Sequence, residues 1–158
     1  MSHGTTSDPN LRLRPARPSD APALAKLVDE AYDHYVERMG TPPRPMTDDY
    51  DDVIRSQRVT VAEVDGAIVG LVALTVTDEG FLIDNIAVDP RRQGSGVGRT
   101  LLVFAEDEAR RGGFDSIHLY TNEVMVENIA LYTRIGYVEF DRRARGAYSV
   151  VYLRKRLG

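Results

Sequence analysis

The residues that most directly suggest chemistry lie near the middle of the chain, where an apolar segment ends in a glycine-rich turn. The turn runs from Gln93 to Gly98 and contains Gly94, Gly96 and Gly98. Because glycine tolerates backbone angles that other residues avoid, such a turn can aim several N–H groups at one point. The apolar spacing after it predicts a helix, whose positive end would face the same point. The turn therefore suits a pyrophosphate, and a plain tight turn is the alternative.

Two common nucleotide-binding turns do not match this spacing. A P-loop requires Gly-x-x-x-x-Gly-Lys-Ser/Thr, and Arg99 stands where its second glycine is needed. A Rossmann turn requires Gly-x-Gly-x-x-Gly, and counting from Gly94 its third glycine also falls on Arg99. The pattern that matches is Gln-x-x-Gly-x-Gly, beginning at Gln93. It resembles the acetyl-CoA loop of the GNAT N-acetyltransferase superfamily, and the resemblance implies acetyl-CoA as co-substrate.

A second motif follows about 30 residues later. It runs from Asn128 to Tyr137 and is similar to the superfamily segment Asn-x-x-Ala/Leu-x-x-Tyr-x-x-x-Gly-Phe/Tyr, slightly compressed. Asn128 and Tyr132 are four residues apart, so they share one face of a helix. The resemblance implies that Asn128 contacts the CoA arm and that the Tyr132 hydroxyl protonates the departing sulfur. The alternative for Tyr132 is a core aromatic on a short helix.

The resemblance also assigns acetyl-CoA contacts to the strand before the turn, to the turn and to its flanking arginines. Arginines beside a pyrophosphate pair with its oxygens, whereas a solvated surface is their usual place. No metal is expected, because the three histidines show no ligand spacing and the chain has no cysteine. The cofactor-binding candidates are Ile86, Ala87, Val88, Arg92, Gln93, Gly94, Ser95, Gly96, Val97, Gly98, Arg99 and Asn128.

A candidate general base lies in the strand that leads to the turn. An alkylammonium must lose a proton before its nitrogen attacks a thioester, and at pH 7 this costs about 4–5 kcal/mol. Asp84 is a charge inside the otherwise apolar segment 81–88, where a charge needs a purpose or a partner. Related enzymes often carry Glu here, so the role of the shorter Asp84 is open, and a solvent-facing or salt-bridged residue is the alternative. Glu123, just past the next strand, is a rival base.

Acceptor contacts are expected at the end of the first helix, before a proline-rich loop. In the superfamily this region often walls the acceptor site, which implies that Tyr32 and Tyr35 bind substrate, together with Glu123. A buried or half-buried aromatic stripe is the alternative for the two tyrosines. His34 is expected at the surface, and the acidic segment 48–52 reads as a solvated helix start.

Hydrophobic periodicity and turn residues predict the order β-α-α-β-β-β-α-β-α-β-β. This order resembles the GNAT fold. We expect an α/β (α+β) single domain over 11–158, with a mixed, mostly antiparallel sheet of six to seven strands and helices on both faces. Residues 1–10 are expected to be a disordered tail. The strands are expected at 11–14, 59–64, 68–77, 81–88, 117–121, 137–140 and 147–153, and the helices at 20–38, 47–56, 97–112 and 125–135. Asp65-Gly66 predicts a hairpin turn, and Ser19-Asp20 predicts an N-cap for the first helix.

Composition limits the classes of function. The chain has 158 residues, and its net charge of −4 argues against general nucleic-acid binding. No apolar run approaches the roughly 20 residues of a membrane span, and the absence of cysteine fits a reducing cytoplasm. The final strands, 137–140 and 147–153, are expected to present an apolar edge, rich in apolar residues over 148–153, that needs cover. A homodimer through this region is therefore expected, as is common in the superfamily. The acceptor amine is not identified, and a different acyl-CoA donor or a non-catalytic acetyl-CoA sensor are the alternatives.

Overall fold

The structure is a computed structural model that describes residues 9–158. Most of the predicted tail lies outside these residues, and Pro9 and Asn10 form a turn before the first strand. The elements follow the predicted order. The strands are β1 Leu11–Pro15, β2 Arg58–Val64, β3 Ala67–Thr77, β4 Gly80–Val88, β5 Ser116–Asn122, β6 Val138–Arg145 and β7 Tyr148–Arg156. The α-helices are α1 Ala21–Met39, α2 Tyr50–Ser56, α3 Val97–Arg111 and α4 Val126–Arg134, and 3-10 turns occupy Pro18–Asp20, Arg44–Thr47 and Pro90–Arg92.

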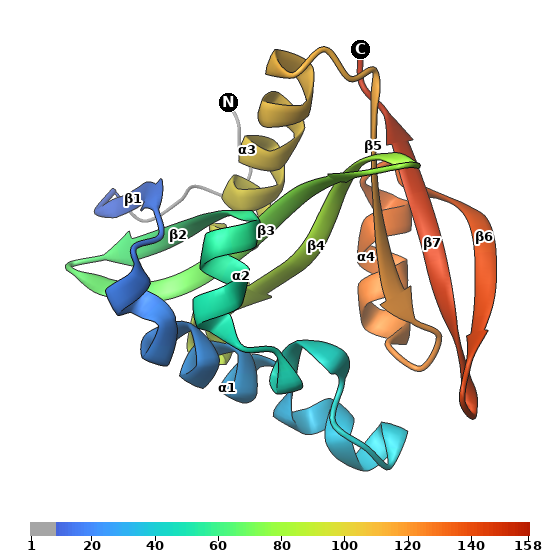
Figure 1. Ribbon diagram of the computed structural model, residues 1–158, viewed down its shortest axis with the longest axis horizontal. Helices are drawn as coiled ribbons and strands as arrows, with labels where there is room; N and C mark the ends of the chain where they lie inside the picture. The colour runs from blue at the N-terminus through green and yellow to red at the C-terminus, as the bar shows by residue number, and fades with distance from the viewer. Residues whose placement is uncertain (1–8) are drawn as a thin grey trace. The chain divides into compact units, whose positions relative to one another are not determined.

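The seven strands of the described chain pair in the order β1-β2-β3-β4-β5-β7-β6 (Figure 1). The β1–β2, β2–β3, β5–β7 and β6–β7 pairs are antiparallel. The β4–β5 pair is parallel, with Leu82 opposite His118 and Ile83 opposite Leu119. The predicted mixed, mostly antiparallel sheet is therefore confirmed.

The chain forms two compact units. The first comprises residues up to Leu74 together with Asn85–Ala105, and the second comprises Thr75–Asp84 and Glu106–Gly158. Strands β3 and β4 and helix α3 contribute residues to both. The single domain expected over 11–158 stays a prediction.

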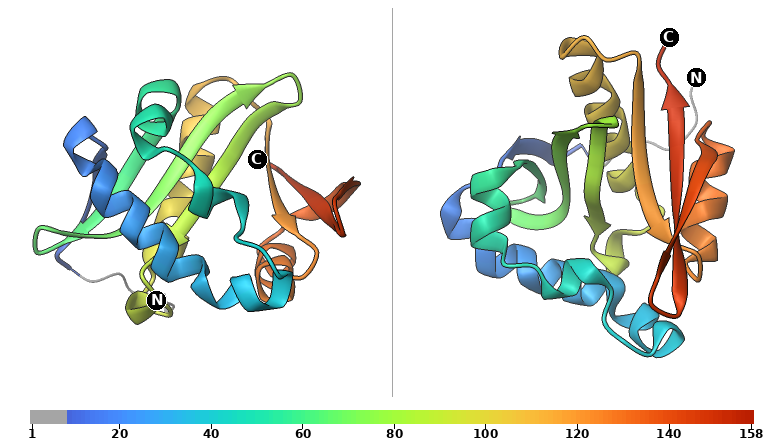
Figure 2. Two further views of the ribbon diagram at one scale, coloured as in Figure 1. Left: turned by 60° about the horizontal axis from the view of Figure 1, so that its bottom comes forward. Right: turned by 45° about the vertical axis from the view of Figure 1, so that its right-hand side comes forward.

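The core of the first unit lies between two helices and one face of the sheet. Leu24, Leu27 and Val28 recur at helical spacing on α1 and are buried. They belong to one apolar cluster with Val61 of β2 and Leu71 of β3. Both ribbon views show α1 and α2 on this face of β2 and β3 (Figure 2). The amphipathic pattern that predicts α1 thus also predicts the face that it buries.

Two turns in this unit have the backbone that their residues predict. Helix α1 ends at Gly40, whose φ is +75° and whose N–H donates to the carbonyl of Val36 at 2.8 Å. Between β2 and β3, Asp65 and Gly66 have φ values of +52° and +84°. Positive φ at both central residues is the requirement of the tight hairpin turn that Asp-Gly favours. The hairpin predicted there is confirmed.

The start of α1 differs from the prediction. Asp20 precedes the helix, but its side chain does not cap it. The carboxylate instead accepts hydrogen bonds from the Arg14 guanidinium at 2.8 and 3.0 Å, and from the Arg17 N–H at 2.7 Å. The hydrogen bond from Arg14 lowers the pKa of Asp20. Asp20 therefore connects β1 to the helix start as an anion.

The last two strands form a longer hairpin than predicted. Strand β6 continues to Arg145 because its charged half still pairs with β7, from Asp141 opposite Tyr152 to Arg145 opposite Tyr148. Strand β7 lies between β5 and β6, so its apolar residues do not form the exposed edge that we expected. The exposed apolar side chains of this hairpin belong to β6 and are Val138 and Phe140.

Helix α3 approaches the opposite face of the first unit's strands at a glycine. A Cβ at Gly70 of β3 would lie 2.9 Å from Val97 Cγ1, 3.0 Å from Leu101 Cδ1 and 3.3 Å from the Ala87 carbonyl oxygen. Close packing of this kind tolerates an added methyl group poorly. Gly70 thus lets the first turns of α3 lie against β3 and β4, and it sets the depth at which the preceding turn is held.

We therefore expect Gly70→Ala to lower the free energy of unfolding by about 1–3 kcal/mol through overpacking. Chemical denaturation measures this change. Val76→Ala is the control, because Val76 lies on the same strand with its side chain 60% exposed, and it should cost less than about 1 kcal/mol. Equal losses in the two variants would show that α3 does not depend on this contact.

Candidate active site

The predicted pyrophosphate turn joins β4 to α3 in the first unit. Gly94 and Gly96 have φ values of +82° and +92°, a region that favours glycine. Helix α3 begins at Val97, directly after the turn. The first N–H groups of an α-helix have no partner within the helix, and they form its positive end. A Cβ at Gly94 would meet no heavy atom within 4 Å, so the turn has open space beside its backbone.

An ion pair fixes the entrance of this turn. Asp89 follows β4, and its carboxylate accepts from the Arg91 N–H at 2.9 Å and from the Arg91 guanidinium at 3.0 and 2.8 Å. The Asp89 N–H donates to the Val69 carbonyl at 2.8 Å. The hydrogen bonds from Arg91 lower the pKa of Asp89. A buried carboxylate at an anion-binding turn would oppose the ligand, and Arg91 compensates that charge.

Ser95, Arg92 and Arg99 are predicted cofactor contacts, and the structure gives them different roles. The Ser95 hydroxyl and N–H both donate to the Arg92 carbonyl, so they hold the turn itself. Arg99 is exposed on the first turn of α3, and Arg92 is half-buried. Both arginines lie in the same unit as the turn. They are the cationic side chains that we predicted as phosphate partners, and that role stays a prediction.

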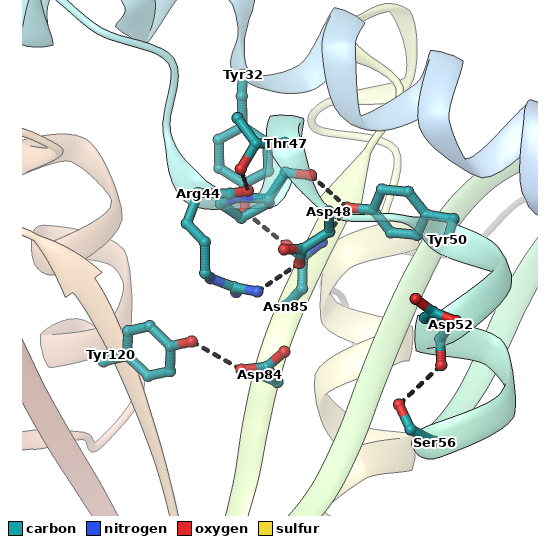
Figure 3. Close-up of polar contacts among 11 residues, drawn as sticks. Tyr32, Arg44, Thr47, Asp48, Tyr50, Asp52, Ser56, Asp84, Asn85 and Tyr120 are labelled. Atoms are coloured by element: carbon teal, nitrogen blue, oxygen red, sulfur yellow. Dashed lines mark hydrogen bonds and ion pairs between the residues drawn. The ribbon is translucent and has the colours of Figure 1, made fainter.

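A chain of hydrogen bonds crosses the first unit beneath α1 and α2 (Figure 3). The Tyr32 hydroxyl donates to Asn85 Oδ1 at 2.8 Å and contacts the Ile86 carbonyl at 3.1 Å. Asn85 Nδ2 donates to the Tyr50 hydroxyl at 3.2 Å, and that hydroxyl donates to the Pro45 carbonyl at 2.7 Å. The chain joins β4 to α1, α2 and the turn Arg44–Thr47.

The last carbonyl fixes the direction of every donor in this chain. A carbonyl only accepts, so the Tyr50 hydroxyl must give its single proton to Pro45. Tyr50 then has to accept from Asn85, which places the Asn85 amide nitrogen toward Tyr50 and its oxygen toward Tyr32. Tyr32 is therefore the donor to Asn85. Its proton serves the scaffold, so a substrate contact by the Tyr32 hydroxyl would use the oxygen as an acceptor.

The second aromatic residue predicted at the acceptor site is more deeply buried. Tyr35 is 4% exposed. Its ring centroid lies 3.9 Å from that of His34, and the Arg38 guanidinium lies 5.2 Å above it. His34 is exposed, as predicted. These contacts match the alternative of a packed aromatic stripe, and a substrate contact by Tyr35 stays a prediction.

In the second unit the candidate base has a defined partner. The Tyr120 hydroxyl of β5 donates to Asp84 Oδ1 of β4 at 2.7 Å (Figure 3). Asp84 is half-buried. The Tyr120 phenol is therefore one defined partner of this carboxylate, and the base role of Asp84 stays a prediction. Tyr120 was not among the predicted site residues.

Helix α4 carries the second predicted motif. Asn128 and Tyr132 lie four residues apart on it, as expected. Asn128 is half-buried near its start, and its N–H donates to the Met125 carbonyl at 3.1 Å. Tyr132 is 7% exposed, and its ring packs edge-on against Tyr137 with centroids 5.8 Å apart.

A buried polar trio supports the Tyr137 ring. The Tyr137 hydroxyl donates to Glu106 Oε2 at 3.1 Å, and Lys155 Nζ lies 3.2 Å from both oxygens of that carboxylate. Tyr137 is fully buried. Burial raises the pKa of Tyr137, and the Glu106 charge raises it further, so the phenol stays a donor. The candidate acid Tyr132 thus rests on a ring whose direction is fixed by an ion pair.

Glu123, the rival candidate for the general base, contacts residues of the β6–β7 hairpin in the second unit. Glu123 Oε2 accepts from the Ser149 N–H at 2.7 Å, and Oε1 lies 3.6 Å from the Arg142 guanidinium. These contacts give Glu123 a place in the structure without excluding a substrate contact, which stays a prediction. Within residues 9–158, no three or more His, Asp or Glu side chains are arranged to hold a metal ion. None of the helices described is long and apolar enough to cross a membrane.

Comparison with known families confirms the family that the motifs indicate. A family model described as "Acetyltransferase (GNAT) domain" matches residues 55–139. The match includes the glycine turn and the whole motif from Asn128 to Tyr137, and it covers more than half of the chain. The chain belongs to the GNAT acetyltransferase family.

The sequence identities to individual relatives are low. The chain is 36% identical over 94 residues to "IAA acetyltransferase" of Azospirillum brasilense, and the match spans 58% of this chain and 60% of that relative. A GCN5-related N-acetyltransferase structure from Rhodopseudomonas palustris is 21% identical, with 99% and 100% coverage of the two chains and a TM-score of 0.79. PaiA N-acetyltransferase of Thermoplasma acidophilum in complex with coenzyme A is 16% identical, with 92% and 98% coverage and a TM-score of 0.78. At these identities the solved structures show the fold.

The polar trio beneath Tyr132 leads to a stability prediction. Lys155→Met removes the cation and leaves the Glu106 carboxylate buried beside an uncharged phenol. We expect a loss of about 2–4 kcal/mol in the free energy of unfolding at pH 7, since breaking a buried pair leaves one charge uncompensated. Denaturant unfolding measures the loss. Lys26→Met, at an exposed position of α1, is the control, and the prediction is wrong if both variants unfold at the same denaturant concentration.

Proposed function

We propose that this protein is an N-acetyltransferase that uses acetyl-CoA and transfers the acetyl group directly to a primary amine in a ternary complex. The observation that carries the proposal is the glycine turn that leads into α3 in a member of the GNAT family. The Thermoplasma relative binds coenzyme A, and the Azospirillum relative is an acetyltransferase by name. The acceptor class is a small-molecule amine, an amino acid or peptide N-terminus, or a lysine.

The first unit supplies the anion-binding part of this proposal. We assign the pyrophosphate to the N–H groups of Gly94 and of 96–98, where positive-φ glycines and the start of α3 coincide, whereas the Ser95 N–H holds the turn. Arg92 and Arg99 add positive charge, and the Arg91–Asp89 pair removes the opposing one. The β4 residues 86–88 and Asn128 of α4 are assigned to the rest of the cofactor, as the family resemblance implies.

The second unit supplies two groups that handle protons. Asp84 takes the proton of the attacking ammonium, which makes the nitrogen lone pair available for the carbonyl carbon. The Tyr132 hydroxyl gives its proton to the sulfur as the carbon–sulfur bond breaks. The ammonium loses two protons in all. The first goes to Asp84 before the attack and is released to solvent, and the second leaves the nitrogen of the tetrahedral intermediate and replaces the proton that Tyr132 gives to sulfur. The products are the amide, the CoA thiol and one released proton, and both residues regain their starting state. A cysteine acyl-enzyme cannot form, because the chain has no cysteine.

Assembly and location complete the proposal. We propose a homodimer that buries the exposed apolar side chains of β6, Val138 and Phe140, which are 69% and 37% exposed. This replaces our earlier expectation of an apolar edge on β7. A reducing cytoplasm is the proposed location, because a chain without cysteine has no need of disulfides.

Release of free CoA tests the activity, and binding tests the turn. A panel of a diamine, an amino-acid amide, a peptide N-terminus and a lysine peptide should contain at least one acceptor that accelerates thiol release from acetyl-CoA. Gly96→Ala should weaken CoA binding by at least ten-fold in calorimetry, because a Cβ at φ +92° strains the turn and blocks backbone approach. Gly66→Ala carries similar strain at φ +84° in a remote hairpin and should bind CoA normally. Equal affinities for both variants would refute the assignment of the turn.

The role of Tyr132 is tested by removing one oxygen. Tyr132→Phe should lower kcat by about 10²–10³-fold, within the usual contribution of a general acid, and leave CoA affinity nearly unchanged. Steady-state kinetics with the fastest amine of the panel, together with calorimetry for CoA, separates the two effects. If the variant turns over at nearly the parent rate, Tyr132 is not the general acid and is a core aromatic residue instead.

A further inference from the structure

The contact between Tyr120 and Asp84 follows from the register of β4 and β5. Leu82 pairs with His118 and Ile83 with Leu119 in this parallel ladder. The next step along both strands places Asp84 opposite Tyr120. Directly opposed residues present their side chains to the same face of a sheet. The hydroxyl and the carboxylate therefore meet at 2.7 Å as a consequence of the strand pairing.

The chemistry of the two groups determines the direction of this hydrogen bond. An ionised carboxylate only accepts, so the phenol must donate its proton to Asp84. The hydrogen bond from Tyr120 uses one of about four lone-pair sites on the two carboxylate oxygens. The contact thus fixes the orientation of the carboxylate.

Tyr120 is itself held in place from the other side. Its ring centroid lies 5.5 Å from that of Tyr152, which is its partner in the β5–β7 register. The Arg143 guanidinium lies 4.1 Å above the Tyr152 ring, and it pairs with Glu79 and Asp141 at 2.7 and 2.8 Å. Stacked layers of this kind restrict the rotation of both rings. The donor that orients Asp84 is therefore supported by β7 and β6.

We propose that Tyr120 is a positioning residue for the general base: it holds the Asp84 carboxylate toward the incoming amine. This inference rests on the base role of Asp84 in the proposed function. Aspartate is one methylene shorter than the glutamate often found here, so its carboxylate has less reach and depends more on its direction. Proton transfer requires the base within hydrogen-bond distance of the proton, and a small rotation of a short side chain loses that distance.

A double-mutant cycle tests whether Tyr120 acts through Asp84. Tyr120→Phe keeps the ring and should lower kcat/KM for the amine by about ten-fold, the weight of one hydrogen bond to a charged group. Asp84→Asn should lower it by about 10²-fold. The double variant should match Asp84→Asn alone, because no base remains to be oriented. In all three variants KM for acetyl-CoA should stay within about two-fold of the parent value.

Two matched acceptor amines distinguish a positioning role of Tyr120 from a merely structural one. The probes are the fastest alkylamine of the panel and its β,β-difluoro analogue, whose ammonium is acidic enough to be mostly neutral at pH 8. The neutral amine needs little help from a base, so the loss in Tyr120→Phe should shrink to about two-fold or less with the fluorinated probe. A misfolded or misaligned site would lose the same factor with both probes.

Tyr152→Phe is the control for removing a hydroxyl from this pair of rings. It keeps the aromatic contact with Tyr120 and should retain the parent kcat/KM. Thermal unfolding of both Phe variants checks their folding. If Tyr120→Phe is only partly folded, the ratio of kcat/KM for the two acceptors still gives the test, because that ratio does not depend on the fraction of active enzyme.

The outcomes distinguish the base role of Asp84 from the positioning role of Tyr120. If Asp84→Asn keeps full activity, the base assignment in the proposed function is wrong and this inference is wrong with it. If Asp84→Asn is impaired while Tyr120→Phe matches the parent, only the positioning role is refuted. If the two losses multiply in the double variant, Tyr120 acts independently of Asp84, and that result also overturns the inference.

Discussion

A buried amide in the middle of a strand is the constraint on which the first unit depends. Asn85 is 6% exposed, and a primary amide without partners for its oxygen and nitrogen is costly to bury. Tyr32 and Tyr50 supply those partners, and the Pro45 carbonyl fixes the direction of the chain. The requirement therefore determines where α1, α2 and the proline-rich turn lie against β4. An apolar residue at 85 would remove the link between the two hydroxyls and leave them only their contacts with the carbonyls of Ile86 and Pro45.

The second unit meets a similar requirement with charge. Glu106 is 8% exposed, and it is satisfied by Lys155 together with the Tyr137 hydroxyl. Apolar residues of the same volume would be no less stable in such a place, since desolvation offsets most of the Coulomb attraction. The trio contributes to the orientation of the Tyr137 side chain. It sets the plane of the Tyr137 ring, and the edge-on contact passes that orientation to Tyr132.

Local spacing predicted much of this structure. The glycine turn before α3, the Asn128–Tyr132 pair on α4 and the Asp-Gly hairpin depend on residues within one or two turns of each other, so their patterns are visible in the sequence. The contact between Tyr120 and Asp84 joins residues 36 positions apart. It depends on which strands pair and in which register, and a single sequence does not record either. The local sequence around Tyr120 therefore predicted no site role for it.

The wrong predictions for β7, β6 and Asp20 also arose because the sequence does not record which elements contact each other. Strand β7 was expected to be an exposed edge because its residues are apolar, but apolar residues are equally suited to the interior position that the strand order gives it. Charged residues ended the predicted β6 too early, although an edge strand accommodates them by pairing their charges along the strand. Asp20 had the residue type of a helix cap, and the guanidinium of Arg14 supplied a stronger partner than the helix N–H groups.

Two aspartates on and just after β4 show why residue type alone does not identify a base. Asp89 is held by a guanidinium, which favours the anion strongly and lowers the pKa of that carboxyl. A carboxylate stabilised in this way is a poor acceptor of a proton from an amine, and Asp89 serves to shape the turn. Asp84 accepts a hydrogen bond from the neutral Tyr120 phenol, which gives the carboxylate a direction. The partners of the two carboxylates, which only the fold supplies, therefore distinguish two aspartates that the sequence presents alike.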